Sequence, residues 1–86
     1  MSACANQHFT GVTDSVWTCL QAQAQKQFNI TINTNSGQAS QDGFTISWNY
    51  NSSAQTLDIQ CTDSPWWAPC STINGKIHDM VDACLA

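Results

Sequence analysis

Residues 44–61 read FTISWNYNSSAQTLDIQC, and this stretch decides the fold. Apolar residues alternate with polar ones from Phe44 to Tyr50, and again from Leu57 to Cys61. A period of two places every second side chain on the same face, which predicts two half-buried strands. Residues 51–55 between them are few enough for a hairpin. The stretch therefore predicts an antiparallel pair of strands with one apolar face.

The segments on either side have the period of a helix. Residues 13–27 carry an apolar stripe at intervals of three and four, with Thr13 as a suitable N-cap and Asp14 suited to the positive helix end. A second helix is expected to start near Ser71 or Thr72, after a segment in which two prolines bar both helix and central strand. Its buried stripe would consist of Ile73, Ile77, Met80, Val81, Cys84 and Leu85.

A third strand is predicted at Ile30 and Ile32, which alternate with polar residues. The polar residues 34–43 after it are expected to form a mobile loop. The predicted fold class is therefore α+β, with the order α-β-β-β-α in one domain of residues 1–86 that begins with a tail of residues 1–9. Because both helices must bury a stripe, we expect a two-layer sandwich with both helices on one face of a three-stranded antiparallel sheet.

Charge and hydropathy exclude two classes of function. The chain has six Asp and two Lys, no Arg and no Glu, and a formal net charge of −4. Nucleic-acid binding is not expected, because it requires Lys and Arg to neutralise phosphates. No membrane span is expected either, because no apolar run approaches the roughly 20 residues that a span requires.

Five cysteines in so short a chain favour disulfides and an oxidising compartment. Their spacings are not those of a metal site, and no C-x-x-C pair occurs. We therefore expect a secreted or periplasmic protein. Residues 1–6 have neither a basic start nor an apolar segment, so no signal peptide is expected within this chain.

The sequence leaves the disulfide pairing open. The preferred pairing is Cys19 with Cys84 and Cys61 with Cys70, and its rival is Cys19 with Cys70 and Cys61 with Cys84. Cys4, in the polar tail, is expected to be unpaired or bonded to a partner chain. A lipidated N-terminus is a further alternative, since Ser2-Ala3-Cys4 matches the end of a lipobox.

The candidate binding site is Trp66-Trp67, which lies between Pro65 and Pro69. One indole could cap the open end of the core while the other lies on the surface. Alternatively, the pair could form an aromatic platform for a sugar ring or a protein partner. The polar face of the sheet, with Thr45, Ser47 and Asn49, could supply hydrogen bonds beside that platform or be simply solvated.

Nothing in the sequence assembles a catalytic site. His8 is expected in the tail, and His78 with Asp82 on a solvated helix flank, so neither a metal site nor a cofactor is predicted. The predicted function is that of a small non-enzymatic interaction protein, such as an inhibitor, effector or surface antigen, that binds a protein partner. The alternative is a carbohydrate-binding module that uses the Trp66-Trp67 loop. A homodimer through an edge strand without Lys, or through Cys4, is also possible.

Overall fold

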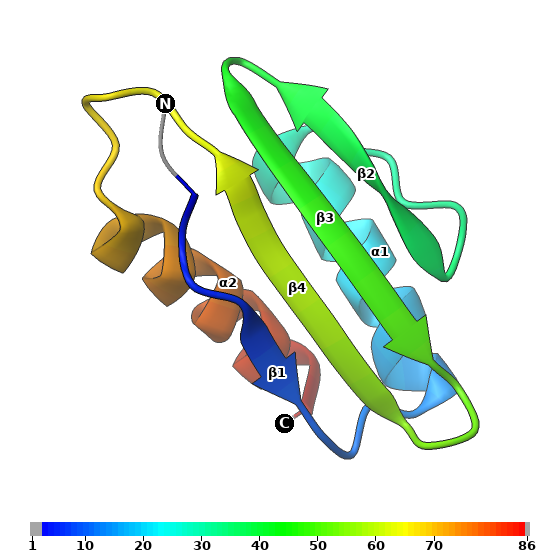
Figure 1. Cartoon of the computed structure of the whole chain (residues 1–86). Coiled ribbons are helices and arrows are strands. Elements are labelled where there is room, and N and C mark those ends of the chain that lie inside the picture. The colour runs from blue at the N-terminus through cyan, green and yellow to red at the C-terminus, as the bar shows by residue number, and fades with distance from the viewer. Residues whose placement is uncertain (1–2, 86) are drawn as a thin grey trace.

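The computed structural model describes residues 3–85 and has two layers, a four-stranded sheet and two helices that cover one of its faces (Figure 1). The strands are antiparallel and lie in the order β1-β4-β3-β2. In chain order the elements are β1 (Gln7–Phe9), α1 (Asp14–Phe28), β2 (Ser36–Gln41), β3 (Phe44–Asn51), β4 (Thr56–Asp63) and α2 (Cys70–Leu85). The predicted α+β class with an antiparallel sheet is confirmed, but the sheet has four strands rather than three.

The central hairpin of β3 and β4 is the one that alternation predicts. Its register pairs Trp48 with Ile59 and Tyr50 with Leu57 on the face that the helices cover. Residues of both helices complete the core, which also includes Trp17 stacked on Tyr50 at a ring-centroid distance of 4.8 Å. The apolar face of this hairpin therefore organises the whole molecule, as one-sided antiparallel sheets do.

Helix α1 begins and ends on local capping interactions. The Thr13 hydroxyl accepts a hydrogen bond from the Val16 N–H at 3.4 Å. At the other end Asn29 has left-handed geometry, with φ of 55°, and the N–H groups of Asn29 and Ile30 donate to the Gln25 and Ala24 carbonyls. This C-cap turns the chain sharply away from the helix axis.

The predicted strand at Ile30 and Ile32 is wrong. Both side chains are buried, but residues 29–33 join no strand of the sheet. The Gln21 side-chain amide donates to the Ile32 carbonyl at 3.1 Å, a contact with a helix side chain instead of a neighbouring strand. The alternation of Ile30 and Ile32 with polar residues correctly indicated that one side of this segment is buried. Burial of one side does not by itself imply hydrogen bonding to a neighbouring strand.

The fourth strand comes from residues expected to be a mobile loop. β2 pairs along its whole length with β3, and the two are joined by Asp42 and Gly43. Both turn residues have positive φ, 54° and 86°, as a two-residue type I′ hairpin requires. This turn fixes the register of a strand whose own sequence, SGQASQ, has no apolar alternation.

The N-terminal segment is also part of the sheet. β1, which lies in the predicted tail, pairs with β4, and the Cys4 N–H donates to the Cys61 carbonyl at 2.8 Å. Residues 1 and 2 of that predicted tail lie outside the described residues. Main-chain pairing thus extends the N-terminal segment along β4 as far as Cys4.

One of the two disulfides joins the two helices to each other, and the other joins the N-terminal segment beside β4 to α2. Cys19 is bonded to Cys84, with a Cα–Cα distance of 5.8 Å, which is the preferred pair for the two helices. The second bond joins Cys4 to Cys70, so the predicted Cys61–Cys70 bond and the unpaired or intermolecular Cys4 are both wrong. The reason is the pairing of the N-terminal segment with β4, which carries Cys4 to the start of α2.

Cys61 is the free cysteine of the described residues. Its thiol is fully buried and donates to the Asp63 carbonyl at 3.1 Å, and burial raises the pKa of this thiol. A raised pKa leaves little thiolate, the reactive form, at neutral pH. Within residues 3–85 neither helix is long and apolar enough to cross a membrane.

Candidate binding site

The Trp66-Trp67 loop occupies the segment between β4 and α2. Trp66 exposes 90% of its surface and Trp67 61%, the largest exposures among the large apolar side chains that the structure describes. The loop is held by a turn in which the Ala68 N–H donates to the Pro65 carbonyl at 3.1 Å. The Cys4–Cys70 disulfide ties its far end to the N-terminal segment. The two indoles are therefore presented by a constrained backbone.

An apolar pocket of about 460 Å³ opens beside Trp67. It lies at the end of the sandwich where the β2–β3 turn, the C-terminus of α1 and the N-terminus of α2 meet (Figure 1). Its apolar lining includes Phe28, Ile30, Phe44, Ile46, Ile73 and Ile77. Polar groups also line it, among them Gln41, Asp42, Thr72 and Lys76. A volume of this size is within the range of sites that accept a small molecule or one large side chain.

The two tryptophans have different surroundings. Trp67 lines the pocket and makes an edge-to-face contact with Phe44, at a centroid distance of 5.9 Å and an interplanar angle of 86°. Trp66 has no ring contact of this kind and is almost fully exposed. Trp67 is thus a wall of the pocket at the open end of the core, and Trp66, the preceding residue, is an exposed apolar surface that does not line the pocket.

The other predicted binding residues lie on a different surface. Thr45, Ser47 and Asn49 alternate with Phe44, Ile46 and Trp48 along β3, so they face away from the helices. The pocket and Trp67 lie on the helix side. The structure therefore does not bring these three polar residues into one site with the pocket.

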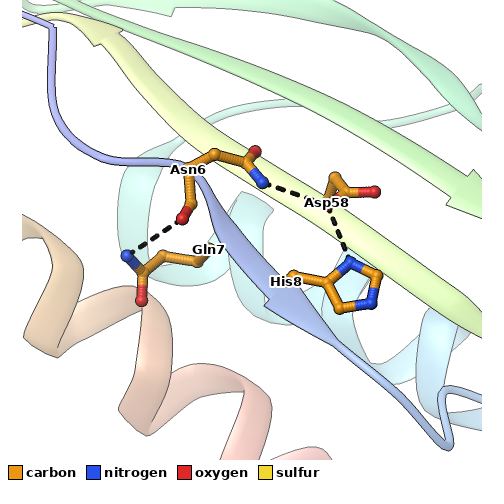
Figure 2. A network of polar contacts seen from close by, with 4 residues as sticks. All are labelled: Asn6, Gln7, His8 and Asp58. Atoms are coloured by element: carbon orange, nitrogen blue, oxygen red, sulfur yellow. Dashed lines mark hydrogen bonds and ion pairs between the residues drawn. The ribbon is translucent and has the colours of Figure 1, made fainter.

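That open face carries a polar network which the sequence did not suggest (Figure 2). His8 Nδ1 lies 2.8 Å from Asp58 Oδ1, and the Asn6 amide donates to the same oxygen at 3.0 Å. These hydrogen bonds lower the pKa of Asp58. Sequence reasoning missed the cluster because it placed His8 in an unpaired tail, and nothing in residues 6–8 indicated that they would lie opposite Asp58.

The remaining titratable groups form no larger cluster. His78 and Asp82, one turn apart on α2, make an exposed contact of 3.4 Å. Within residues 3–85 no three His, Cys, Asp or Glu side chains are grouped in a way that could hold a metal ion.

The chain matches no protein-family model, and neither a curated protein nor a solved structure is detectably similar to it. Any function therefore has to be argued from the geometry of the pocket and of the exposed indoles.

Proposed function

We propose that this protein is a small secreted or periplasmic, non-enzymatic interaction protein that binds a protein partner through Trp66 and the neighbouring pocket. The observation that carries the proposal is the exposure of Trp66, which is 90% exposed and directly precedes Trp67, a residue that lines an apolar pocket. An aromatic side chain of this kind buries about 150–250 Å² when covered. At about 25 cal/mol per Å², covering Trp66 contributes roughly 4–6 kcal/mol before the costs of association.

The pocket gives such a partner a second anchor. Its apolar lining and volume suit one aliphatic or aromatic side chain from the partner, while Trp66 packs against the surface around that side chain. Hot spots in protein interfaces combine these elements, a buried anchor in a pocket and a tryptophan beside it. The constrained loop lowers the ordering cost, because the prolines, the turn and the Cys4–Cys70 bond already fix its backbone.

The proposal also includes an oxidising compartment and a function without catalysis, and each rests on its own observations. Two disulfides are consistent with an oxidising environment, where such bonds persist. The one free thiol among the described cysteines is buried, with a raised pKa, and it does not line the pocket. The pocket is lined by one carboxylate, Asp42, one amine, Lys76, and no His or Cys, and Asp42 and Lys76 form no ion pair among the described residues that would match an acid with a base.

Carbohydrate binding is the second candidate. The indole face of Trp66 could stack on a sugar ring, with Gln41 and Asp42 at the pocket as hydrogen-bonding groups. The hydroxyls and amide of β3 that would have supported this function lie on the opposite face of the sheet. The geometry therefore supports the protein partner better.

A Trp66→Ser variant tests the proposal against a matched control. Leu85→Ser removes a second exposed apolar side chain, 42% exposed, at the far end of α2. Partners captured by the immobilised wild-type protein are identified and their affinities measured by calorimetry. We expect Trp66→Ser to weaken the partner's affinity about 30-fold or more, the loss typical of a hot spot, and Leu85→Ser to change it less than about threefold.

A glycan array with the same variants separates the two candidates. Saturable sugar binding that is lost in Trp66→Ser, with no protein partner, would favour the carbohydrate-binding module. If Trp66→Ser and Leu85→Ser behave alike in both assays, the Trp66 loop is not a binding site. Association of two copies through a strand edge is a further class of partner, and it depends on another part of the molecule.

A further inference from the structure

The outer edge of β2 is a row of main-chain groups that pair with no other strand of the sheet. β2 is the last strand of the sheet, and its partner β3 lies on one side only. The Tyr50 N–H donates to the Asn35 carbonyl at 2.6 Å, so Asn35 and every second residue after it, Gly37, Ala39 and Gln41, direct their main-chain groups toward β3. Ser36, Gln38 and Ser40 consequently direct an N–H and a carbonyl outward. The Thr34 hydroxyl reaches the Ser36 carbonyl at 2.9 Å, which agrees with this orientation.

This edge has none of the features that usually prevent association. Edge strands are commonly protected by Lys, by Pro, by a bulge or by very short length. β2 has six residues without charge or proline, and its pairing with β3 runs without a register shift. The opposite edge of the sheet is β1, which has three residues.

The edge is also neutral in an acidic protein. The chain has a formal charge of −4, yet residues 27–41 contain no charged side chain. Two copies repel each other least when they approach through such a segment. A charged strand of another protein would gain no electrostatic attraction from the uncharged edge of β2. A second copy of this chain presents the same uncharged edge.

We propose that two copies of this protein pair through β2, antiparallel about a two-fold axis at Gln38, to form one continuous eight-stranded sheet. The outward residues are symmetric about Gln38, so Ser36 lies opposite the partner's Ser40, and Gln38 lies opposite the partner's Gln38. Each chain contributes three N–H groups and three carbonyls, and the pairing forms six hydrogen bonds, in which the Ser36 carbonyl uses its second lone pair beside the one that accepts from the Thr34 hydroxyl. An isologous interface requires this self-complementarity.

The side chains are compatible with this register. On the open face Gln38 meets the partner's Gln38, and two amides can hydrogen-bond to each other. On the helix face Gly37 meets the partner's Ala39, and both are small. Asp42, the charged residue that follows β2, falls opposite the partner's Thr34 rather than opposite another carboxylate.

Sedimentation equilibrium at 5–500 µM protein, in buffer with 150 mM NaCl, tests the proposal. The wild-type protein should show a monomer–dimer equilibrium within this range. Gln38→Lys places like charges opposite each other at the two-fold axis, and should raise the dissociation constant at least tenfold. Ser47→Lys is the matched control, because it adds the same charge to the same open face on the central strand β3, and it should change the dissociation constant less than threefold.

Two further measurements make the outcome decisive. Amide hydrogen exchange at Ser36, Gln38 and Ser40 should slow as the protein concentration rises, while exchange at exposed Gln55 should not change. In 1 M NaCl, screening should return part of the affinity that Gln38→Lys loses. A wild-type protein that stays monomeric up to 500 µM overturns the proposal, as does a dimer that Gln38→Lys and Ser47→Lys affect equally. A strand from another protein bound at β2 of a monomer overturns it as well.

Discussion

Replacing the Cys4–Cys70 pair by serine tests how much of the stability comes from the two disulfides. The bonds close loops of 66 and 65 residues, and the loops overlap along most of the chain. In the chain-entropy model, closing one such loop in an otherwise open chain stabilises the fold by about 4.3 kcal/mol. The second bond adds less, because the first already shortens the path between its ends.

That shorter path can be read from the sequence. With Cys19–Cys84 in place, Cys4 reaches Cys70 through 15 residues to Cys19 and 14 residues from Cys84. Closing an effective loop of about 29 residues contributes about 3.6 kcal/mol. The same path applies when Cys4–Cys70 is the bond that remains. We therefore expect each paired serine variant to lose about 3.6 kcal/mol, and the fourfold variant to lose about 8 kcal/mol.

Urea unfolding followed by tryptophan fluorescence measures these differences. A domain of this length has a total stability of about 4–13 kcal/mol, so each paired variant should keep a positive free energy of unfolding, and the fourfold variant should unfold unless the wild type exceeds about 8 kcal/mol. Alkylation of the denatured wild-type protein should label Cys61 alone. A loss below about 1 kcal/mol for Cys4→Ser/Cys70→Ser would refute the reasoning, and so would a fourfold variant that loses no more stability than a paired variant.

Four further substitutions test other parts of the fold by urea unfolding. Tyr50→Phe removes the hydroxyl that donates to Val12 O at 2.9 Å and Asp14 Oδ1 at 3.0 Å, and should cost about 1–2 kcal/mol; a loss under 0.3 kcal/mol would contradict this. Asp58 has a pKa lowered below its ordinary 3.8, so ionised Asp58 stabilises the fold above that pH and the stabilisation is lost as pH falls below it. Asp58→Asn should therefore show a shallower fall in stability from pH 4 to 2 than the wild type, and equal slopes would contradict the assignment. Gly43→Ala, with φ of 86° and a Cβ 3.1 Å from Pro65 Cγ, should cost about 1–3 kcal/mol, whereas Gly75→Ala, with nothing within 4 Å of its Cβ, should stabilise α2 by about 0.5–1 kcal/mol. The same sign for both glycines would contradict the argument.

Periodicity predicted the elements that bury an apolar face. β3, β4 and both helices lie within a residue or two of their predicted positions, because each presents a stripe to the shared core. β2 and β1 could not be found in this way. β2 is a polar edge strand, and β1 has three residues within a polar segment.

The missed strand did have one signal. Asp42-Gly43 is a dipeptide typical of type I′ hairpins, and it directly precedes the strongest strand in the chain. No comparable signal existed for Cys4–Cys70, because that bond depends on how β1 lies along β4. The candidate pocket could not be predicted from the sequence either, because its walls come from five separate segments of the chain and depend on how these pack together.

Several features that sequence reasoning missed lie around the pocket, whereas the His8–Asp58 contact lies on the open face. The Asp42-Gly43 turn packs against Pro65, which begins the tryptophan loop, and Cys4–Cys70 closes the end of that loop. Trp67 then contacts Phe44, the first residue after the turn. The Trp67–Phe44 contact thus forms part of the pocket wall, and the contact with Pro65 and the Cys4–Cys70 bond hold the two ends of the loop that carries Trp67, whereas Cys19–Cys84 joins the two helices elsewhere.

This arrangement separates the roles of the two tryptophans. Trp67 has a structural role, because its ring packs edge-to-face on Phe44 and lines the pocket. The exposure of Trp67 therefore does not by itself imply binding. Trp66 makes no such ring contact, and its exposed side chain contributes little to the stability of the isolated chain. Replacing Trp66 should therefore leave the unfolding free energy within about 0.5 kcal/mol of the wild type, as expected of a surface residue, while Trp67→Ala should lower it measurably. A Trp66 variant with unchanged stability and lost binding would assign the residue to recognition, and a destabilised Trp66 variant would assign it to the fold.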